Sequence, residues 1–390
     1  MALPADRTIP PEKFPENVRR FVAPDSPQPL RQMLARGLVP MKPLVQVCAL
    51  YQLAVSDPGE LGRTATQSVR AMPPAALKQI AAERLLPVVL DWLAETFVDS
   101  REIVQTVVLN QTTDVDTLIR VAQSTQDGRL LEMLAANEAK LLQSPPLIEA
   151  LYFNRQMRQS TIDRVLDLAA RNQLKLPKIP TYQEVVAAIA GTAPKTEEEA
   201  AAADARFAAA QAALNELTGK ADEAQIEEII AAYTAEAEAE GADVEEEADE
   251  GPRRSKSAAG RIRDMNVAEK VRLAMLGTAT ERAILVRDTN KIVARAVIRS
   301  PGITDTEAIA YAKDKSMLDE VIHYIAQNKK WTRHYQIKLN LVMNPKTPTS
   351  EALRFMTHLR INDLRAVARS KGVPGPVSKA AKQMVKARMK

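Results

Sequence analysis

The side chains that most often perform catalysis or bind metals are few in this sequence. Its only cysteine is Cys48, and its histidines are His323, His334 and His358. No two histidines lie three or four residues apart, and a single cysteine cannot complete a zinc site. No glycine-rich phosphate loop, dinucleotide fingerprint or nucleophile elbow occurs. We therefore expect no metal, no cofactor and no enzyme activity. A hydrolase or glycosylase built from carboxylates far apart in the sequence is a third function class, which only coordinates can test.

Lysines and arginines are instead concentrated toward the C-terminal end. Lys291, Arg295 and Arg299 are spaced by four residues, which places them on one side of a helix. Residues 354–390 contain ten lysines and arginines but one acidic residue, Asp363. Such a face attracts phosphate backbones or acidic protein segments. The candidate partner- or anion-binding residues are Lys291, Arg295, Arg299, Lys329, Lys330, Trp331, Arg333, Tyr335, Lys338, Arg365 and Arg369.

These candidates also have a simpler interpretation. Charged residues keep the surface of a helical array soluble, and a polar cap closes its end. Trp331 and Tyr335 can add stacking or cation–π contacts to a binding face, but a single tryptophan among helices is also typical of a packed core. The sequence leaves both interpretations open.

The elements that position these residues are predicted to be helices throughout. Glycine is scarce, at 13 of 390 residues, and aromatic residues make up 4% of the chain. Strand-rich folds favour the opposite composition. Apolar residues recur at helical spacing from Leu30 to about Ala190 and again from about Arg263. We therefore predict an all-α protein whose helices are separated and opened by prolines.

A repeat organises these helices. The segments SPGITDTEAI at 300–309 and NPKTPTSEAL at 344–353 are similar and start 44 residues apart, as Asn110 and Asn154 also are. Periods of 20–50 residues indicate repeat architectures. The clearest unit predicts helices over about 306–313, 317–327 and 332–342.

Two features of these units follow from helix chemistry. Thr306 and Ser350 are predicted N-caps, because each hydroxyl precedes a glutamate and an apolar run. Helices this short are not stable alone in water, so each must bury its apolar side against neighbouring units.

The period and the three helices per unit resemble the armadillo/HEAT class of α-solenoids. The segments RDTNKIVARAVIRSPGITDTEAI and HYQIKLNLVMNPKTP also resemble a repeat found in uncharacterised bacterial proteins, particularly deltaproteobacterial ones. The resemblance covers about residues 265–371, with a looser similarity over 30–172. It implies a fold and carries no catalytic residue. The asparagine closing each unit is similar to the groove-lining asparagine of armadillo repeats, which holds a peptide backbone, but its place at a helix end also fits a capping role.

The distribution of charged residues divides the chain into segments. Residues 197–250 contain 18 acidic and two basic residues, whereas residues 251–390 contain 29 basic and 11 acidic ones. We predict two helical-repeat blocks joined by an acidic linker rich in alanine and glutamate. The predicted segments are a proline-rich extended arm (1–29), an N-terminal repeat block (30–190), an acidic linker, helical and disordered (191–260), a C-terminal repeat block (261–375) and a basic cap or tail (376–390).

These features predict a protein that binds others. The start of the chain lacks an export signal, and the longest strongly apolar run, Leu85–Leu90, is too short to span a membrane. With one cysteine, this indicates a cytoplasmic protein. We expect a non-enzymatic solenoid scaffold or adaptor that binds protein partners. The alternative is nucleic-acid binding by the basic C-terminal repeats, with the acidic residues 236–250 as an internal shield.

Overall fold

The structure is a computed structural model that describes residues 8–179, 182–189, 196–217, 229–233 and 258–389. Every regular element in these ranges is a helix, so the all-α prediction is confirmed for the described chain. The contacts divide the chain into two compact units, Met1–Met157 and Arg158–Lys390. The predicted shield, residues 236–250, lies outside the described residues.

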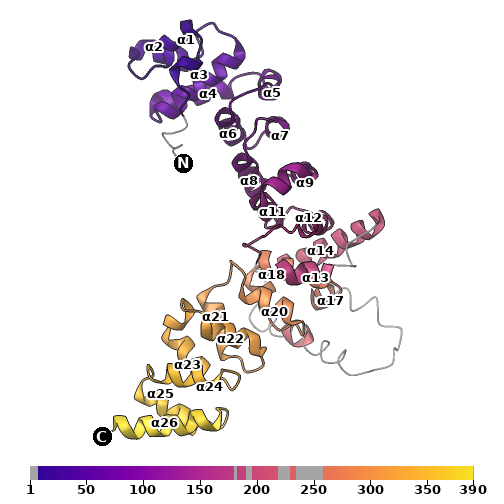
Figure 1. Cartoon of the computed structure of the whole chain (residues 1–390), viewed down its shortest axis with the longest axis vertical. Helices are drawn as coiled ribbons and strands as arrows, with labels where there is room; N and C mark the ends of the chain where they lie inside the picture. Colours follow the sequence, from indigo (N-terminus) through magenta and orange to yellow (C-terminus); the bar gives the residue numbers. More distant parts are fainter. Residues whose placement is uncertain (1–7, 180–181, 190–195, 218–228, 234–257, 390) are drawn as a thin grey trace. The chain divides into compact units, whose positions relative to one another are not determined.

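The first unit is built from short helices that contact their neighbours along the chain (Figure 1). Helix α3 packs on α4, α5 packs on α7, and α8 packs on α11. Prolines occupy the first turns of α3, α5, α6 and α11, as predicted. The elements are η2 (Pro11–Lys13), α1 (Glu16–Val22), α2 (Gln28–Ala35), α3 (Pro43–Ser56), α4 (Glu60–Arg70), α5 (Pro74–Ala82), α6 (Pro87–Thr96), α7 (Arg101–Leu109), α8 (Val115–Ser124), α9 (Gly128–Ala136), α10 (Glu138–Gln143) and α11 (Pro145–Tyr152).

The proline-rich start differs from an extended arm. Pro15 and Pro27 are the N-caps of α1 and α2, so the prolines here open helices instead of preventing them. Phe14 and Phe21, which belong to this segment, are buried. The start of the chain is therefore packed into the first unit.

The second unit continues with helices of similar length. Helix α18 packs on α20, α21 on α23, and α25 on α26. Its elements are α12 (Gln159–Arg171), α13 (Tyr182–Ile189), α14 (Glu197–Leu217), α17 (Ala258–Arg263), α18 (Val267–Leu276), α19 (Ala279–Leu285), α20 (Lys291–Ile298), α21 (Asp305–Lys313), α22 (Asp319–Gln327), η3 (Trp331–Arg333), α23 (Tyr335–Met343), α24 (Thr349–Met356), α25 (Ile361–Arg369) and α26 (Gly375–Arg388).

Helix α14 comes from the acidic stretch, yet it is packed. It contacts α12 and α17 and buries Ala203, Phe207, Ala210 and Leu214. These residues recur at three- and four-residue spacing, which forms one apolar stripe on the helix. The first part of the predicted linker is therefore a component of the second unit's core.

The predicted three-helix unit is observed as α21, α22 and the pair η3–α23, but its N-cap was predicted wrongly. Thr304, not Thr306, caps α21: its Oγ1 accepts from the Glu307 amide at 3.3 Å, and Glu307 Oε2 accepts from the Thr304 amide at 2.9 Å. This reciprocal capping box needs a glutamate three residues after the cap. Likewise Pro348 precedes α24, and Ser350 lies inside that helix.

None of the described helices combines the length and the apolar character needed to span a bilayer.

Candidate binding surfaces

Asparagines recur at the ends of α7, α11 and α23. Asn110, Asn154 and Asn344 each donate two hydrogen bonds from Nδ2 to backbone carbonyls at the end of an earlier helix, so each side chain joins two segments about 30 residues apart. The acceptors are Ala81 and Glu83 for Asn110 (2.6 and 2.8 Å), Ala122 and Thr125 for Asn154 (2.7 and 3.0 Å), and Ala312 and Asp314 for Asn344 (3.1 and 2.9 Å).

The remaining side-chain atom of each asparagine is also used. Oδ1 accepts from the amide two residues further on, at 2.9 Å for Asn110, 2.8 Å for Asn154 and 3.0 Å for Asn344. Because both amide protons and the oxygen have partners, these asparagines bond the protein's own backbone. The capping interpretation therefore describes them, although each reaches the end of an earlier helix as well as its own turn.

The predicted stripe on α20 contacts other helices. Lys291 Nζ lies 2.8 Å from Glu320 Oε1, and Arg295 Nη1 lies 2.8 Å from Glu184 Oε1. The guanidinium of Arg299 lies 5.5 Å from the centre of the Tyr324 ring. Folding thus places carboxylates or an aromatic ring against these three cations, which reduces the positive potential of the stripe.

The two aromatic candidates, Trp331 and Tyr335, make contacts within the fold. Trp331 is 3% exposed and packs edge-on against Tyr324, so its side chain is part of the core. Tyr335 donates from its hydroxyl to Asp363 and accepts from the Arg360 amide at 3.0 Å. Of the two interpretations that the sequence leaves open for Trp331, the packed core is therefore the one that describes it, because burial removes the ring from solvent.

The cations around Trp331 differ in their surroundings. Lys330 Nζ lies 3.8 Å from Asp305 Oδ1, and Lys338 is half-buried. Lys329 and Arg333 are exposed and make no ion pair within the described part of the chain. On α25, Arg365 donates to Asn362 Oδ1 at 3.3 Å, whereas Arg369 is exposed near the helix end. The structure thus leaves part of the predicted set exposed, namely Lys291, Lys329, Lys330, Arg333 and Arg369.

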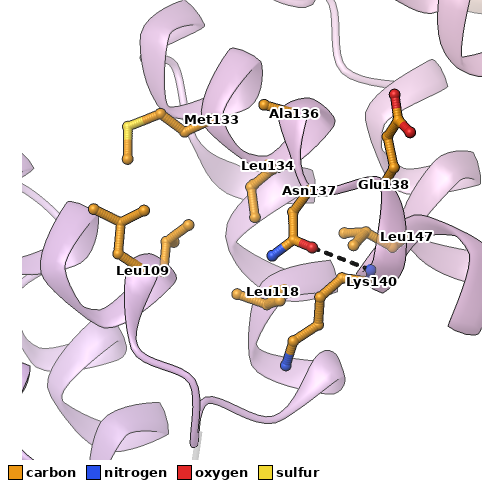
Figure 2. A pocket seen from close by; sticks show the side chains of 10 residues that line it. Leu109, Leu118, Met133, Leu134, Ala136, Asn137, Glu138, Lys140 and Leu147 are labelled. Atoms are coloured by element: carbon orange, nitrogen blue, oxygen red, sulfur yellow. Dashed lines mark hydrogen bonds between the residues drawn. The ribbon is translucent and has the colours of Figure 1, made fainter.

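The first unit contains an apolar cavity that no sequence motif indicates. It has a volume of about 360 Å³ and is lined from α7, α8, α9, α10 and α11. Figure 2 shows Leu109 on one side, Asn137 and Lys140 on the other, and Leu134 between them. Leu109 is 63% exposed, although it is the last residue of α7, a helix whose valines are buried. Solvent exposure of a leucine cannot be read from helical periodicity at the last residue of a helix, where the backbone turns away.

A buried polar cluster joins α12, α14 and α18. Arg272 is 0% exposed; its Nη1 donates to Gln159 Oε1 at 3.0 Å, and its guanidinium lies 5.0 Å from the Phe207 ring. Gln159 Nε2 in turn donates to Asp163 Oδ1 at 2.7 Å. Burial raises the pKa of Asp163 to about 7, although Arg272 and the hydrogen bond from Gln159 act in the opposite direction.

The same cluster continues to the acidic helix. Arg206 Nη2 lies 3.3 Å from Glu269 Oε1, and burial raises the pKa of Glu269. Asp204 accepts from both the amide and the hydroxyl of Ser160, each at 2.9 Å. These bonds give α14 a fixed position on α12 and α18. They connect residues far apart in the sequence, so no local pattern indicated them.

A second ion pair, between Arg282 and Glu307, joins α19 to α21. Arg282 Nε and Nη2 donate to Glu307 Oε1 and Oε2 at 2.8 and 3.0 Å, a bidentate geometry that is stronger than a single contact. Burial acts to raise the pKa of Glu307, but the hydrogen bonds from Arg282 and Thr304 lower it below its ordinary value.

Other potentially reactive groups are isolated. The described residues contain no group of three or more histidine, cysteine or acidic side chains able to hold a metal ion. Burial raises the pKa of the Cys48 thiol to about 11, so this group carries a proton at neutral pH.

Comparison of the chain with protein-family models gave no match, and searches of curated proteins and of solved structures gave none either.

Proposed function

We propose that this protein is a non-enzymatic scaffold or adaptor, an α-solenoid of the armadillo/HEAT kind that binds a protein partner. The observation that carries the proposal is the recurrence of one asparagine bridge at the ends of α7, α11 and α23. The same bond at spacings of 44 residues, as between Asn110 and Asn154, is expected of equivalent positions in stacked repeats.

The cavity beside Leu109 is the proposed contact surface. Its lining is mostly apolar, which suits a bulky aliphatic or aromatic side chain of the partner. Glu138 lies exposed at its edge, so a basic residue next to the partner's apolar side chain is favoured. Lys140 donates from Nζ to the Thr113 carbonyl at 3.0 Å, so part of its positive charge is used within the unit.

A peptide selection tests this proposal. Displayed random peptides are selected on the full chain, and each selected peptide is then measured against Leu109→Glu and Leu38→Glu by calorimetry. The two leucines form a matched pair, because both are 63% exposed and both belong to the first unit. A glutamate at the cavity edge would lose hydration of its carboxylate when an apolar side chain enters the cavity, and this cost weakens binding.

We expect the selected peptides to contain a bulky apolar residue with a basic neighbour, and to bind Leu109→Glu at least tenfold more weakly than the wild type. Binding to Leu38→Glu should be unchanged. Equal binding to both variants would show that the cavity is not the contact surface, and a selection that yields no binding peptide would contradict the proposed adaptor function.

A further inference from the structure

Helix α26 has two unlike sides. Val377 and Ala381 are buried, and α26 packs on α25 at the C-terminal end (Figure 1). Lys379, Lys382 and Lys386 are exposed. At 3.6 residues per turn, the spacings of three, four and seven residues place these lysines on one side of the helix, opposite the buried pair. Their ammonium groups therefore share one solvent-facing stripe.

Other exposed cations lie at the turn that precedes α26. Arg369 and Lys371, at the end of α25 and in the following turn, are both exposed. Lys315, from the loop between α21 and α22, has its Nζ 3.0 Å from the point where a Cβ of Gly372 would lie. Folding thus brings a lysine from a distant part of the sequence next to the turn that carries Lys371.

Little within the fold neutralises this charge. Asp363 is the one acidic residue between 354 and 389, and it accepts a hydrogen bond from Tyr335. In the described chain, none of the six cations on this surface forms an ion pair; they are Lys315, Arg369, Lys371, Lys379, Lys382 and Lys386. Like charges that share a surface without counter-charges produce a positive potential that attracts an anionic partner.

Arg388 shows that this end of the helix is held in place. Its Nη1 donates to the Leu359 carbonyl at 2.6 Å and its Nη2 to the Thr357 carbonyl at 2.7 Å. These two bonds anchor the last turn of α26 to the loop before α25. The lysine stripe is consequently presented on a helix that is fixed at both its packed side and its end, which lowers the entropy lost on binding.

We propose that this surface, the exposed side of α26 with Arg369, Lys371 and Lys315, docks on the phosphate backbone of double-stranded DNA. Ammonium groups bind phosphates as point charges without reading sequence. The surface differs from a protein-binding one because it lacks aromatic anchors, the usual hot spots of protein interfaces. Met389 is the one exposed large apolar side chain among the described residues 354–389.

The aromatic rings nearby also argue against single-stranded nucleic acid. Binding of unpaired bases depends on exposed rings on which the bases stack. Trp331 is buried, and Tyr335 is engaged by Asp363 and by the guanidinium of Arg360, 5.0 Å from its ring centre. Lysine can only donate to a ribose hydroxyl, and it donates equally to a phosphate oxygen, so the stripe has no feature that requires RNA.

Fluorescence anisotropy with labelled 20-base-pair DNA duplexes of two unrelated sequences tests the proposal. The full chain is compared with the triple variant Lys379→Gln, Lys382→Gln, Lys386→Gln over 50–200 mM salt. The control triple variant, Lys13→Gln, Lys42→Gln, Lys175→Gln, removes the same charge from exposed lysines elsewhere. Circular dichroism melting verifies that both variants fold.

We expect the wild type to bind both duplexes equally, with an affinity that falls steeply with salt. The α26 variant should bind at least tenfold more weakly at low salt, and its slope of log affinity against log salt should shrink by roughly 2.7, because each lost phosphate contact contributes about 0.9. The control variant should keep the wild-type slope. If double-stranded RNA binds with an affinity similar to that of the DNA duplex, this result supports contacts made to phosphate alone.

Three results would overturn the proposal. They are equal weakening by the two triple variants, tighter binding of a single-stranded probe than of the duplex, and tighter binding of a polyglutamate peptide of matched charge. The last result would assign the surface to an acidic protein segment. The surface is separate from the cavity beside Leu109, so Leu109→Glu should leave DNA binding unchanged, and either proposal can fail without the other.

Discussion

Asn344 is hydrogen-bonded from Nδ2 to the carbonyl oxygen of Ala312 at 3.1 Å, across 32 residues of sequence. Both residues are buried, and Asn344 reaches the Asp314 carbonyl as well. The side chain thus satisfies two carbonyls that the end of α21 leaves without intrahelical partners. Asn154 makes the corresponding pair of bonds to the end of α8 in the first unit.

Removal of the bridge at Asn344 should therefore destabilise the fold. We expect Asn344→Ala to lower the free energy of unfolding by about 2–3 kcal/mol, because one buried and one half-buried carbonyl lose their donors. Asn344→Asp should cost at least as much, since a carboxylate cannot donate. Asn172→Ala is the control, as that exposed side chain bonds only its own helix, at Leu168. Urea unfolding followed by circular dichroism measures all three, and equal effects at 344 and 172 would contradict the bridging role.

The pair Arg282–Glu307 should make stability depend on acid pH. The pKa of Glu307 is lowered in the folded state from an ordinary value of 4.5. The pair therefore contributes stability above pH 4.5, and this contribution is lost as the pH falls through the lowered pKa. We expect Glu307→Gln to melt at a lower temperature than the wild type at pH 7. The difference between the two melting temperatures should become smaller toward pH 3. A constant difference across that range would refute the linkage.

Asp163 should make the stability of the fold depend on pH in the opposite direction. Its pKa is raised to about 7 in the folded state from 3.8, so the folded protein holds the proton more tightly than the unfolded one. Stability from this group is thus greatest below pH 3.8 and declines as the pH rises toward 7, by about 2–4 kcal/mol.

The variant Asp163→Asn isolates this effect. It keeps an oxygen for the bond from Gln159 but cannot ionise, so the free energy of unfolding should depend less steeply on pH between 4 and 7. Asp167→Asn removes a more exposed carboxylate from the same helix and is the matched control. Denaturant titrations at each pH provide the measurement, and identical slopes for Asp163→Asn and the wild type would disprove the assignment.

Trp331 should behave as a core residue. We expect Trp331→Ala to lower the free energy of unfolding by about 3–5 kcal/mol, as is usual for large-to-small changes of buried aromatic residues. Trp331→Phe should retain most of the stability, and Arg333→Ala, at an exposed neighbouring position, should change it by less than about 0.5 kcal/mol. Native-like stability of Trp331→Ala would show that the ring is not needed for packing.

Much of the local structure was accessible from the sequence. Prolines, as at Pro43 and Pro145, correctly indicated helix starts, because a helix's first turn depends on residues only a few positions apart. The capping box at Thr304 and Glu307 is equally local, and the glutamate three residues after Thr304 distinguishes this cap from the predicted one, Thr306. The spacing of Asn110 and Asn154 can also be read from the sequence. The backbone carbonyls that accept their hydrogen bonds cannot.

The sequence by itself determined that the described chain is helical and where several of its helices begin, since these depend on interactions within one or two turns. Only the tertiary structure decided which charged groups remain accessible. Arg295 meets Glu184 across 111 residues, and Arg272 meets Gln159 across 113, while Lys379 meets no counter-charge among the residues that the structure describes. The physical reason is that a Coulomb or hydrogen-bonding contact depends on separation in space, which is set when distant helices pack together.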